Sequence, residues 1–207
     1  MKLIVGLGNP GEQYRSSRHN LGFLSLDYLA GRHDFPPFRQ GFDALFAKGR
    51  IGDEVVILAK PQTYMNLSGA SLEKLTAYFK VDVKDIIVIH DDLDLPFQAV
   101  RLKNGGGYGG HKGLISIVQH LGSSDFLRVK IGIGKPARKT MVERYVLSPF
   151  AEEEHEALPH VIAAAGDAAG EIVLSGIEAA MRRYHGKAVN EPENKVIPPF
   201  HKGSQGG

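Results

Sequence analysis

The segment Asp-Ile-Ile-Val-Ile-His at residues 85–90 constrains the fold of this chain more than any other stretch of the sequence. A run of β-branched residues between polar ends is typical of a strand that is buried on both faces of its sheet. Such a strand requires a layer of helices on each side. The segment therefore predicts a three-layer α/β fold.

Apolar periodicity predicts further strands and helices in alternation. The expected strands are 2–6, 42–51, 54–60, 99–103 and 127–133, and the expected helices are 19–32, 68–80, 111–121 and 152–185. Gly52 and Asp53 can join two of these strands in a hairpin, so the sheet cannot be entirely parallel. The last helix is expected to break near Gly166 or Gly170. We expect a mixed, mainly parallel sheet flanked by helices, with functional groups in loops at the strand ends.

Length and composition favour one soluble domain. We expect a single α/β domain over residues 1–185 and a flexible tail over residues 186–207, where few side chains can be buried. The absence of cysteine excludes disulfides, thiol catalysis and Cys-based zinc sites, and it is consistent with a cytoplasmic location. No segment approaches the roughly 18 to 20 uninterrupted apolar residues that a membrane helix requires.

The formal net charge of +2 conceals an uneven distribution of charge along the chain. Residues 98–144 include nine Lys or Arg residues and two acidic residues, a local excess of +7. The balancing acids gather in the segments 82–94 and 152–156. This asymmetry favours a polyanionic partner, although a solvated surface explains many charge runs.

Two glycine-rich segments are similar to nucleotide-binding loops but depart from them. The motif GLGNPG at residues 6–11 fits G-x-G-x-x-G, yet Pro10 and the polar run 12–18 delay the helix that should begin within the loop. In the segment 105–113, His111 interrupts the match to a Walker A loop, and glycine stands where Ser or Thr would bind Mg²⁺. Dinucleotide binding and nucleotide hydrolysis are therefore disfavoured. The glycines can still let backbone N–H groups approach a phosphate.

Two segments contain residues that could bind a metal ion, and one of them remains as an alternative at this point. Asp91, Asp92 and Asp94 supply the hard oxygen ligands that Mg²⁺ prefers, although a carboxylate at a strand end can equally orient a histidine. The segment HEALPH at residues 155–160 is similar to the zinc motif H-E-x-x-H, but it has one residue too many and contains Pro159. We interpret its two histidines as surface residues.

Amide and imidazole side chains gather at the predicted loops: Asn9, His19, Asn20, Asn66, His90 and His111, with Asp91 beside His90. A neutral imidazole can accept a proton from water while a carboxylate fixes its tautomer and stabilises the imidazolium. An Asn side chain can donate to a developing oxyanion. These groups suit the hydrolysis of an activated ester without a covalent enzyme intermediate.

At these residues the sequence closely resembles the bacterial-type peptidyl-tRNA hydrolase family. The matching segments, in the same order as in the family, are VGLGNPG (5–11) with Tyr14 and Arg18-His19-Asn20, PQTYMNLSG (61–69), HDDLDLP (90–96), the glycine-rich segment 105–113 and IGIG (131–134). The resemblance implies hydrolysis of the ester between the peptide and the 3′ ribose of peptidyl-tRNA, which recycles tRNA from prematurely released peptidyl-tRNA. It implies neither a metal nor a cofactor.

By position, the resemblance makes His19 the general base for the attacking water and makes Asp91 the residue that holds His19 and stabilises its charged form. Asn9 would recognise the peptide near the ester and help to reject aminoacyl-tRNA with a free amine. The remaining residues around the peptidyl-tRNA end would be Tyr14, Tyr64 and Asn66. Residues 1–185 would then be the catalytic domain.

One position departs from the family pattern, because Lys112 stands where members usually have Asn after Gly-Gly-His. An ammonium group donates hydrogen bonds but cannot accept them, so we expect Lys112 to contact a substrate carbonyl or phosphate. Acceptor-stem RNA is read largely through its shape, phosphates and 2′-hydroxyls. This suits the basic residues near the glycine loop: Lys103, Arg128 and Lys130.

Two other functions stay open on the sequence alone. A non-catalytic RNA-binding protein of the same fold would keep the basic region, but His19, Asp91, Asn9 and Asn66 together favour the enzyme. A metal-dependent phosphohydrolase would use the aspartates at residues 91–94. We expect a monomer by default.

Overall fold

The computed structural model describes residues 1–184, so the expected tail at residues 186–207 lies outside the described residues. The chain forms a seven-stranded sheet with the order β2-β3-β4-β1-β5-β7-β6. The strands are β1 (Lys2–Gly6), β2 (Arg39–Gly41), β3 (Ala44–Ile51), β4 (Glu54–Pro61), β5 (Ile86–Asp92), β6 (Val100–Asn104) and β7 (Leu127–Gly132). The central strands β4, β1, β5 and β7 are parallel, while β2, β3 and β6 pair antiparallel at the two edges.

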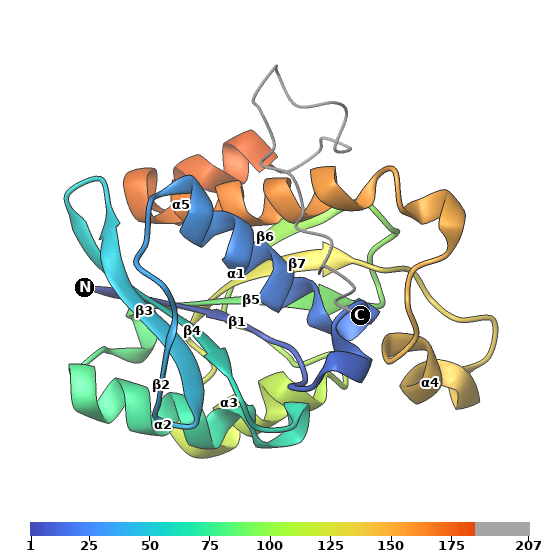
Figure 1. Cartoon of the computed structure of the whole chain (residues 1–207), viewed down its shortest axis with the longest axis horizontal. Coiled ribbons are helices and arrows are strands. Elements are labelled where there is room, and N and C mark those ends of the chain that lie inside the picture. Colours follow the sequence, from blue (N-terminus) through green and yellow to red (C-terminus); the bar gives the residue numbers. More distant parts are fainter. Residues whose placement is uncertain (185–207) are drawn as a thin grey trace, which may run out of the picture.

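Helices cover both faces of this sheet (Figure 1). They are α1 (Leu21–Arg32), α2 (Ser68–Phe79), α3 (Lys112–Leu121), α4 (Val142–Val146) and α5 (Leu158–Tyr184). On β5, Ile87 and Ile89 pack toward α1 and α5, whereas Ile86 and Val88 pack toward α2 and α3, and all four are fully buried. The prediction of a three-layer α/β fold is therefore confirmed.

The first glycine motif permits close packing of a helix on the central strand. A Cβ added to Gly6 would lie 2.2 Å from the carbonyl oxygen of Gly22, and one added to Gly22 would lie 2.4 Å from the carbonyl oxygen of Ile89. These contacts leave no room for a side chain, so α1 can cross β1 and β5 only at glycine. Two short 3₁₀ turns, Glu12–Tyr14 and Arg18–Asn20, precede α1. The second turn places His19 against Asp91 near the end of β5.

The observed helix α5 differs from the prediction. Gly166 and Gly170 remain helical, and the non-helical residue is Gly176, with φ 80° and ψ 165°. The reason is packing, because a Cβ on Gly166 would lie 2.6 Å from the ring of Tyr28 on α1. Gly166 therefore allows α1 and α5 to approach each other.

By length and composition α5 could cross a membrane, with a mean hydropathy of 1.2 over its most apolar window. Half of that window is buried inside the fold. Val161, Ile162 and Ile172 of α5 pack in the same core as Ile87 and Ile89. This is the composition expected of a helix that packs one apolar face against the sheet.

Candidate active site

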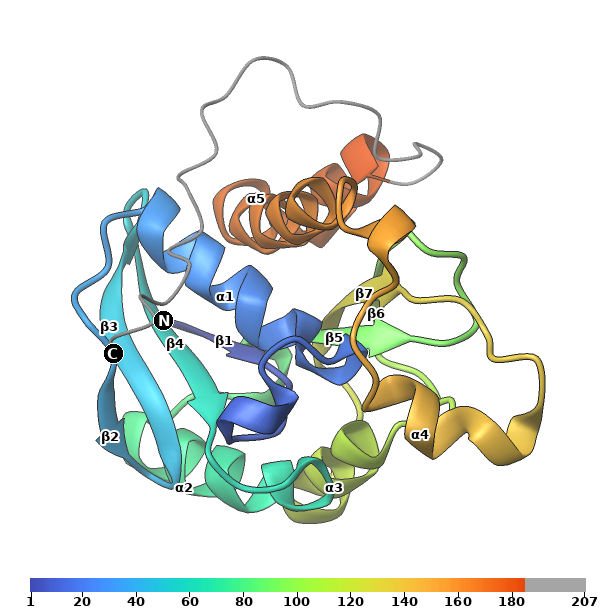
Figure 2. The same ribbon diagram turned by 45° about the vertical axis from the view of Figure 1, so that its right-hand side comes forward.

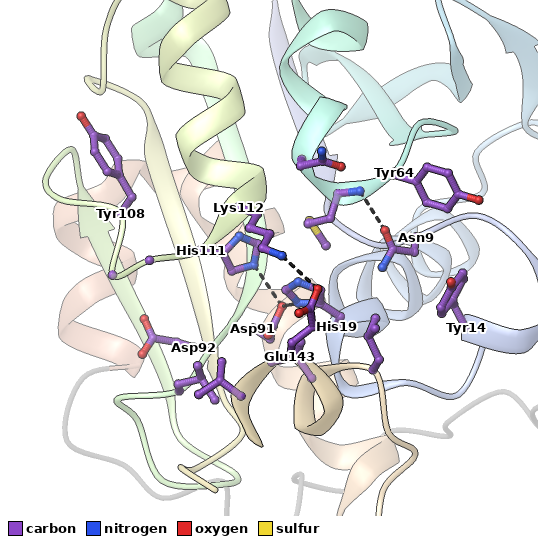
Figure 3. A pocket seen from close by; sticks show the side chains of 18 of the residues that line it. Asn9, Tyr14, His19, Tyr64, Asp91, Asp92, Tyr108, His111, Lys112 and Glu143 are labelled. Atoms are coloured by element: carbon purple, nitrogen blue, oxygen red, sulfur yellow. Dashed lines mark hydrogen bonds and ion pairs between the residues drawn. The ribbon is translucent and has the colours of Figure 1, made fainter. Parts of the chain in front are cut away.

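The parallel strands β4, β1 and β5 all end on the same side of the sheet, and the predicted site residues other than Lys103, Arg128 and Lys130 gather there (Figure 3). A pocket of about 620 Å³ lies on this side. Its walls come from the segments that follow β1, β4 and β5, from the glycine-rich segment before α3, and from α4. This is the position where open α/β sheets bind their ligands.

His19 and Asp91 meet at the base of the pocket although they lie 72 residues apart in sequence. Nδ1 of His19 lies 2.8 Å from Oδ1 of Asp91, and both side chains are buried. A carboxylate accepts only, so Nδ1 carries the proton and donates it to Asp91. The other ring nitrogen, Nε2, is then the basic atom available to the pocket.

His111, at the start of α3, donates to the same carboxylate oxygen. Its Nδ1 accepts a hydrogen bond of 3.2 Å from the backbone N–H of Gly113 and so caps α3. The proton of the neutral ring must then be on Nε2, which lies 3.1 Å from Oδ1 of Asp91. The α3 cap therefore fixes the tautomer of His111, a function that the sequence analysis did not assign to this residue.

Burial and the two imidazoles act in opposite directions on Asp91. Burial alone raises the pKa of its carboxyl group, but the hydrogen bonds and charges of His19 and His111 hold the pKa well below its usual range. Asp91 is therefore ionised at neutral pH. The neighbouring His90 is fully buried, and burial, reinforced by His111, lowers its pKa to about 3. His90 is thus neutral, and its Nδ1 donates to the carbonyl oxygen of Asp91 at 2.7 Å.

His19, Asp91 and His111 also form a group that could be considered for a metal ion, because their ligand atoms lie within 4.8 Å of one another. A metal on Nε2 of His111 would require the proton on Nδ1. Nδ1 already faces the N–H group of Gly113, so metal binding would break the cap of α3. Ligating histidines normally donate their other N–H to an acceptor. The donor set therefore does not fit a metal ion without rearrangement.

The aspartates that follow Asp91 are paired with lysines. Oδ2 of Asp92 lies 2.9 Å from Nζ of Lys130, and Oδ1 of Asp94 lies 2.7 Å from Nζ of Lys135. The hydrogen bond and charge of Lys135 lower the pKa of Asp94. A magnesium ion would have to displace both lysines, so the pairing does not support the magnesium alternative.

The amide group of Asn9 is oriented by backbone hydrogen bonds. Its Oδ1 accepts from the backbone N–H of Met65 at 2.8 Å, and its main chain exchanges two bonds with the side chain of Asn20, at 2.8 and 3.0 Å. Nδ2 of Asn9 has no hydrogen-bond partner within residues 1–184 and lines the pocket. Asn9 therefore presents two N–H donors to a bound molecule.

Aromatic side chains flank the site on both sides (Figure 3). Tyr14 and Tyr64 stand on one side, and the exposed fraction of Tyr64 is 59%. Asn66 lines the pocket beside Tyr64. Tyr108, on the other side, is 41% exposed and also lines the pocket. The sequence analysis missed Tyr108, whose only signal was an aromatic residue within a glycine-rich loop.

Lys112 lies at the mouth of the pocket and is paired with a residue of α4. Its Nζ is 3.1 Å from Oε1 of Glu143, and both side chains are mostly exposed. The pair joins the start of α3 to the wall formed by α4 (Figure 3). The sequence analysis did not identify Glu143. An exposed ion pair of this kind contributes about 0–1 kcal/mol, so a substrate group can replace it.

The basic residues near the glycine loop do not all reach solvent. Lys103 and Arg128 lie opposite each other in the antiparallel pair β6–β7, and Arg101 lies opposite Lys130 on the same face. Lys103 is exposed and Lys130 is half-buried. Arg128, however, is 1% exposed, and its guanidinium group donates to the carbonyl oxygens of Gly106 and Gly107. Arg128 holds the glycine loop in this structure, contrary to the expected phosphate contact.

Comparison with known proteins identifies one family. The family model described as peptidyl-tRNA hydrolase matches residues 3–192. Peptidyl-tRNA hydrolase from Exiguobacterium sibiricum is 45% identical over 89% of this chain and 100% of its own length. The enzyme from Chloroflexus aggregans is 47% identical over 89% of this chain and 99% of its own. The crystal structure of peptidyl-tRNA hydrolase from Acinetobacter baumannii superposes with a TM-score of 0.86 at 34% identity, covering 92% of this chain and 97% of that one.

Proposed function

This chain belongs to the peptidyl-tRNA hydrolase family and hydrolyses peptidyl-tRNA, and we propose that His19 is the general base of the reaction. Nε2 of His19 takes a proton from a water molecule, and the water oxygen attacks the carbonyl carbon of the ester. Asp91 stabilises the imidazolium that forms. The intermediate then collapses, the bond to the ribose oxygen breaks, and His19 returns the proton to that oxygen. The products are tRNA with a 3′ hydroxyl and a peptide with a free carboxyl group, which releases the second proton of the water to solvent.

Asn9 recognises the peptide next to the ester in this scheme. Its free Nδ2 group can donate to a carbonyl oxygen of the peptide, or to the oxyanion as it develops. The bond from Met65 to Oδ1 supports this assignment, because it prevents the amide from turning its acceptor toward the substrate. In aminoacyl-tRNA a free amino group replaces the peptide bond, and it offers further donors but no acceptor for Nδ2 of Asn9. Asn9 therefore contributes to the rejection of aminoacyl-tRNA.

The RNA part of the substrate extends from the pocket across the glycine loop. The proposed contacts with the peptidyl-tRNA end are Tyr14, Tyr64, Asn66 and Lys112, and those with acceptor-stem phosphates are Lys103 and Lys130. Exposed tyrosines provide stacking surfaces for nucleobases. Arg128 contributes indirectly, because it shapes the loop between the two groups. No metal or cofactor takes part in the proposed reaction.

We further propose that the chain acts as a monomer in the cytoplasm, with residues 1–185 as its single catalytic domain. The composition supports a cytoplasmic location, because the chain contains no cysteine. Sedimentation of the purified protein with and without tRNA tests the oligomeric state. A dimer that persists at low micromolar concentration would contradict the monomer.

The hydrogen bond of 2.8 Å between His19 and Asp91 carries the mechanism, because it leaves Nε2 as the free base at the pocket. The test is the release of an N-blocked amino acid from tRNA by the wild type and by His19→Ala. We expect the variant to lose about 10²–10⁴-fold in kcat and to retain tRNA binding. Equal rates of release by the wild type and by His19→Ala would contradict the assignment of His19 as the general base. An inactive wild type that still binds tRNA would favour a non-catalytic RNA-binding protein.

A further inference from the structure

Arg18, the residue before the proposed general base, is almost completely enclosed. Its side chain is 7% exposed, and its guanidinium group makes two parallel bonds to Glu154, from Nη1 to Oε1 at 2.8 Å and from Nη2 to Oε2 at 2.6 Å. The guanidinium carbon also lies 4.5 Å from the ring centre of Tyr145 and 4.6 Å from that of Phe150. Only a planar cation with a forked set of donors can make all these contacts.

The partners of Arg18 belong to the segment that forms one wall of the pocket. Tyr145 lies within α4, and Phe150 and Glu154 follow α4 in the chain. The backbone N–H of Arg18 donates to the carbonyl oxygen of Ser148 at 3.0 Å, which adds a main-chain bond between the same two segments. One residue thus joins the turn that carries His19 to the wall that faces it.

Besides Arg18, the α4 segment is held mainly by apolar packing, because Val146 and Phe150 are buried in the core and the ring of Phe150 contacts that of Phe97. The helix has five residues, of which Val146 is the buried one, and it stands away from the sheet (Figure 2). A helix this short is not stable by itself. Apart from Arg18, its side-chain bonds in the described chain include the exposed pair Lys112–Glu143 and a bond of 2.5 Å from Tyr145 Oη to the carbonyl oxygen of Ile133. Arg18 therefore supplies the buried ion pair that fixes the α4 segment to the turn carrying His19, in addition to this apolar packing.

We propose that Arg18 is a positioning residue that sets the width of the substrate pocket by fixing α4 relative to His19. Val142, Val146 and Leu147 of this segment line the pocket, so a shift of α4 changes the space for the substrate. Asp91 holds His19 independently of the Arg18 side chain. Loss of the anchor therefore weakens substrate binding much more than it slows the chemical step. The proposal rests on the proposed function only in that the substrate occupies this pocket.

The test compares steady-state kinetics on N-blocked aminoacyl-tRNA for the wild type, Arg18→Lys, Glu154→Gln and the double variant. Arg18→Lys keeps the positive charge but loses the fork and the stacking. We expect KM to rise about tenfold in each single variant, with kcat changed less than about threefold. The double variant should lose little more than either single one, because both remove the same anchor. Glu154→Gln keeps the test valid if Arg18→Lys does not fold.

Arg15→Lys is the matched control, because Arg15 lies three residues before Arg18 and pairs with Glu12 at the surface, at 3.3 Å. Its KM and kcat should equal those of the wild type. Unchanged KM in the Arg18 and Glu154 variants, with only a lower unfolding temperature, would reduce the pair to a structural role and overturn the proposal. A loss confined to kcat would also overturn it, because it would place the effect on His19. An inactive wild type would instead contradict the proposed function.

Discussion

His19 and His111 donate to the same oxygen atom, Oδ1 of Asp91, at 2.8 and 3.1 Å. Their ring centres lie 4.9 Å apart. The second ring nitrogen differs between the two histidines. In His111 it accepts the hydrogen bond that caps α3, whereas in His19 it is free at the pocket. Asp91 is thus held by a rigid donor on one side and orients the proposed base on the other.

This arrangement predicts a large loss of activity for Asp91→Asn. The amide oxygen can still accept both hydrogen bonds that Oδ1 accepts now, but the negative charge that stabilises the imidazolium is lost. We expect kcat to fall about 10²–10⁴-fold, with KM changed much less. Asp85→Asn, which removes a partly buried carboxylate that pairs with Lys2 outside the pocket, is the control and should leave kcat unchanged. A loss below about threefold in Asp91→Asn would contradict the assigned role.

The buried His90 predicts a pH dependence of stability. Its pKa is lowered to about 3 in the fold, mainly by burial, from an ordinary value of 6.5. Between these values the unfolded chain binds a proton that the native chain does not, so stability is lost as the pH falls from 6.5 toward 3. The contribution is about 1.4 kcal/mol per pH unit. The free energy of unfolding, measured by urea titration at several pH values between 7 and 5, should change less steeply with pH in His90→Asn than in the wild type. Plots of the free energy of unfolding against pH that run parallel for the variant and the wild type would contradict this prediction.

Most of the fold could be predicted from patterns that are local in sequence. The apolar run at residues 86–89 identified β5, and the turn at Gly52 identified the hairpin of β3 and β4. The elements that were missed, β2 and α4, have three and five residues and no periodicity of their own. Both are stabilised by contacts with distant segments, which no local pattern records.

The site was predicted less completely than the fold. The types and positions of His19, Asp91 and Asn9 followed from the motifs and the resemblance. The sequence could not indicate that His111 shares Asp91 with His19, because that depends on a bond to Gly113 and on the meeting of α3 with β5. Nor could it separate Arg128 from Lys130, because alternation places both on the same face of β7. Carbonyl groups of the glycine loop decide that Arg128 turns inward.

Lys112 and its partner predict two opposite effects on substrate binding. Lys112→Asn removes the ammonium group that we propose to contact a substrate carbonyl or phosphate, so KM should rise several-fold while kcat is kept. Glu143→Gln releases Lys112 from its exposed ion pair and should lower KM. Steady-state kinetics at low and high salt measure the KM of each variant. The KM of each variant should approach that of the wild type at high salt, because the charges of Lys112 and Glu143 are exposed to screening. Unchanged KM and kcat in Lys112→Asn would count against a substrate contact.

The different placements of Lys103 and Arg128 predict different phenotypes for their loss. Lys103→Gln should weaken tRNA binding and reduce the slope of log K against log salt by about 0.7 to 0.9, the value of one phosphate contact. Arg128→Gln removes a buried guanidinium that holds the glycine loop, so it should lower the unfolding temperature instead. Fluorescence titrations with tRNA over a series of salt concentrations separate the two. A salt slope that Lys103→Gln leaves unchanged would exclude the phosphate contact.

The orientation of Asn9 predicts how the enzyme distinguishes its substrates. Asn9→Asp keeps the size of the side chain and can keep the bond from Met65 to Oδ1, but it replaces the free donor by a negatively charged oxygen. We expect kcat/KM on N-blocked aminoacyl-tRNA to fall about 100-fold. The activity on aminoacyl-tRNA with a free amine should fall less, because the new carboxylate attracts an ammonium group. The ratio of the two rates should therefore narrow in Asn9→Asp and remain unchanged in the control Asn104→Asp, at the exposed end of β6. An unchanged ratio in Asn9→Asp would show that selection against the free amine is made elsewhere in the pocket.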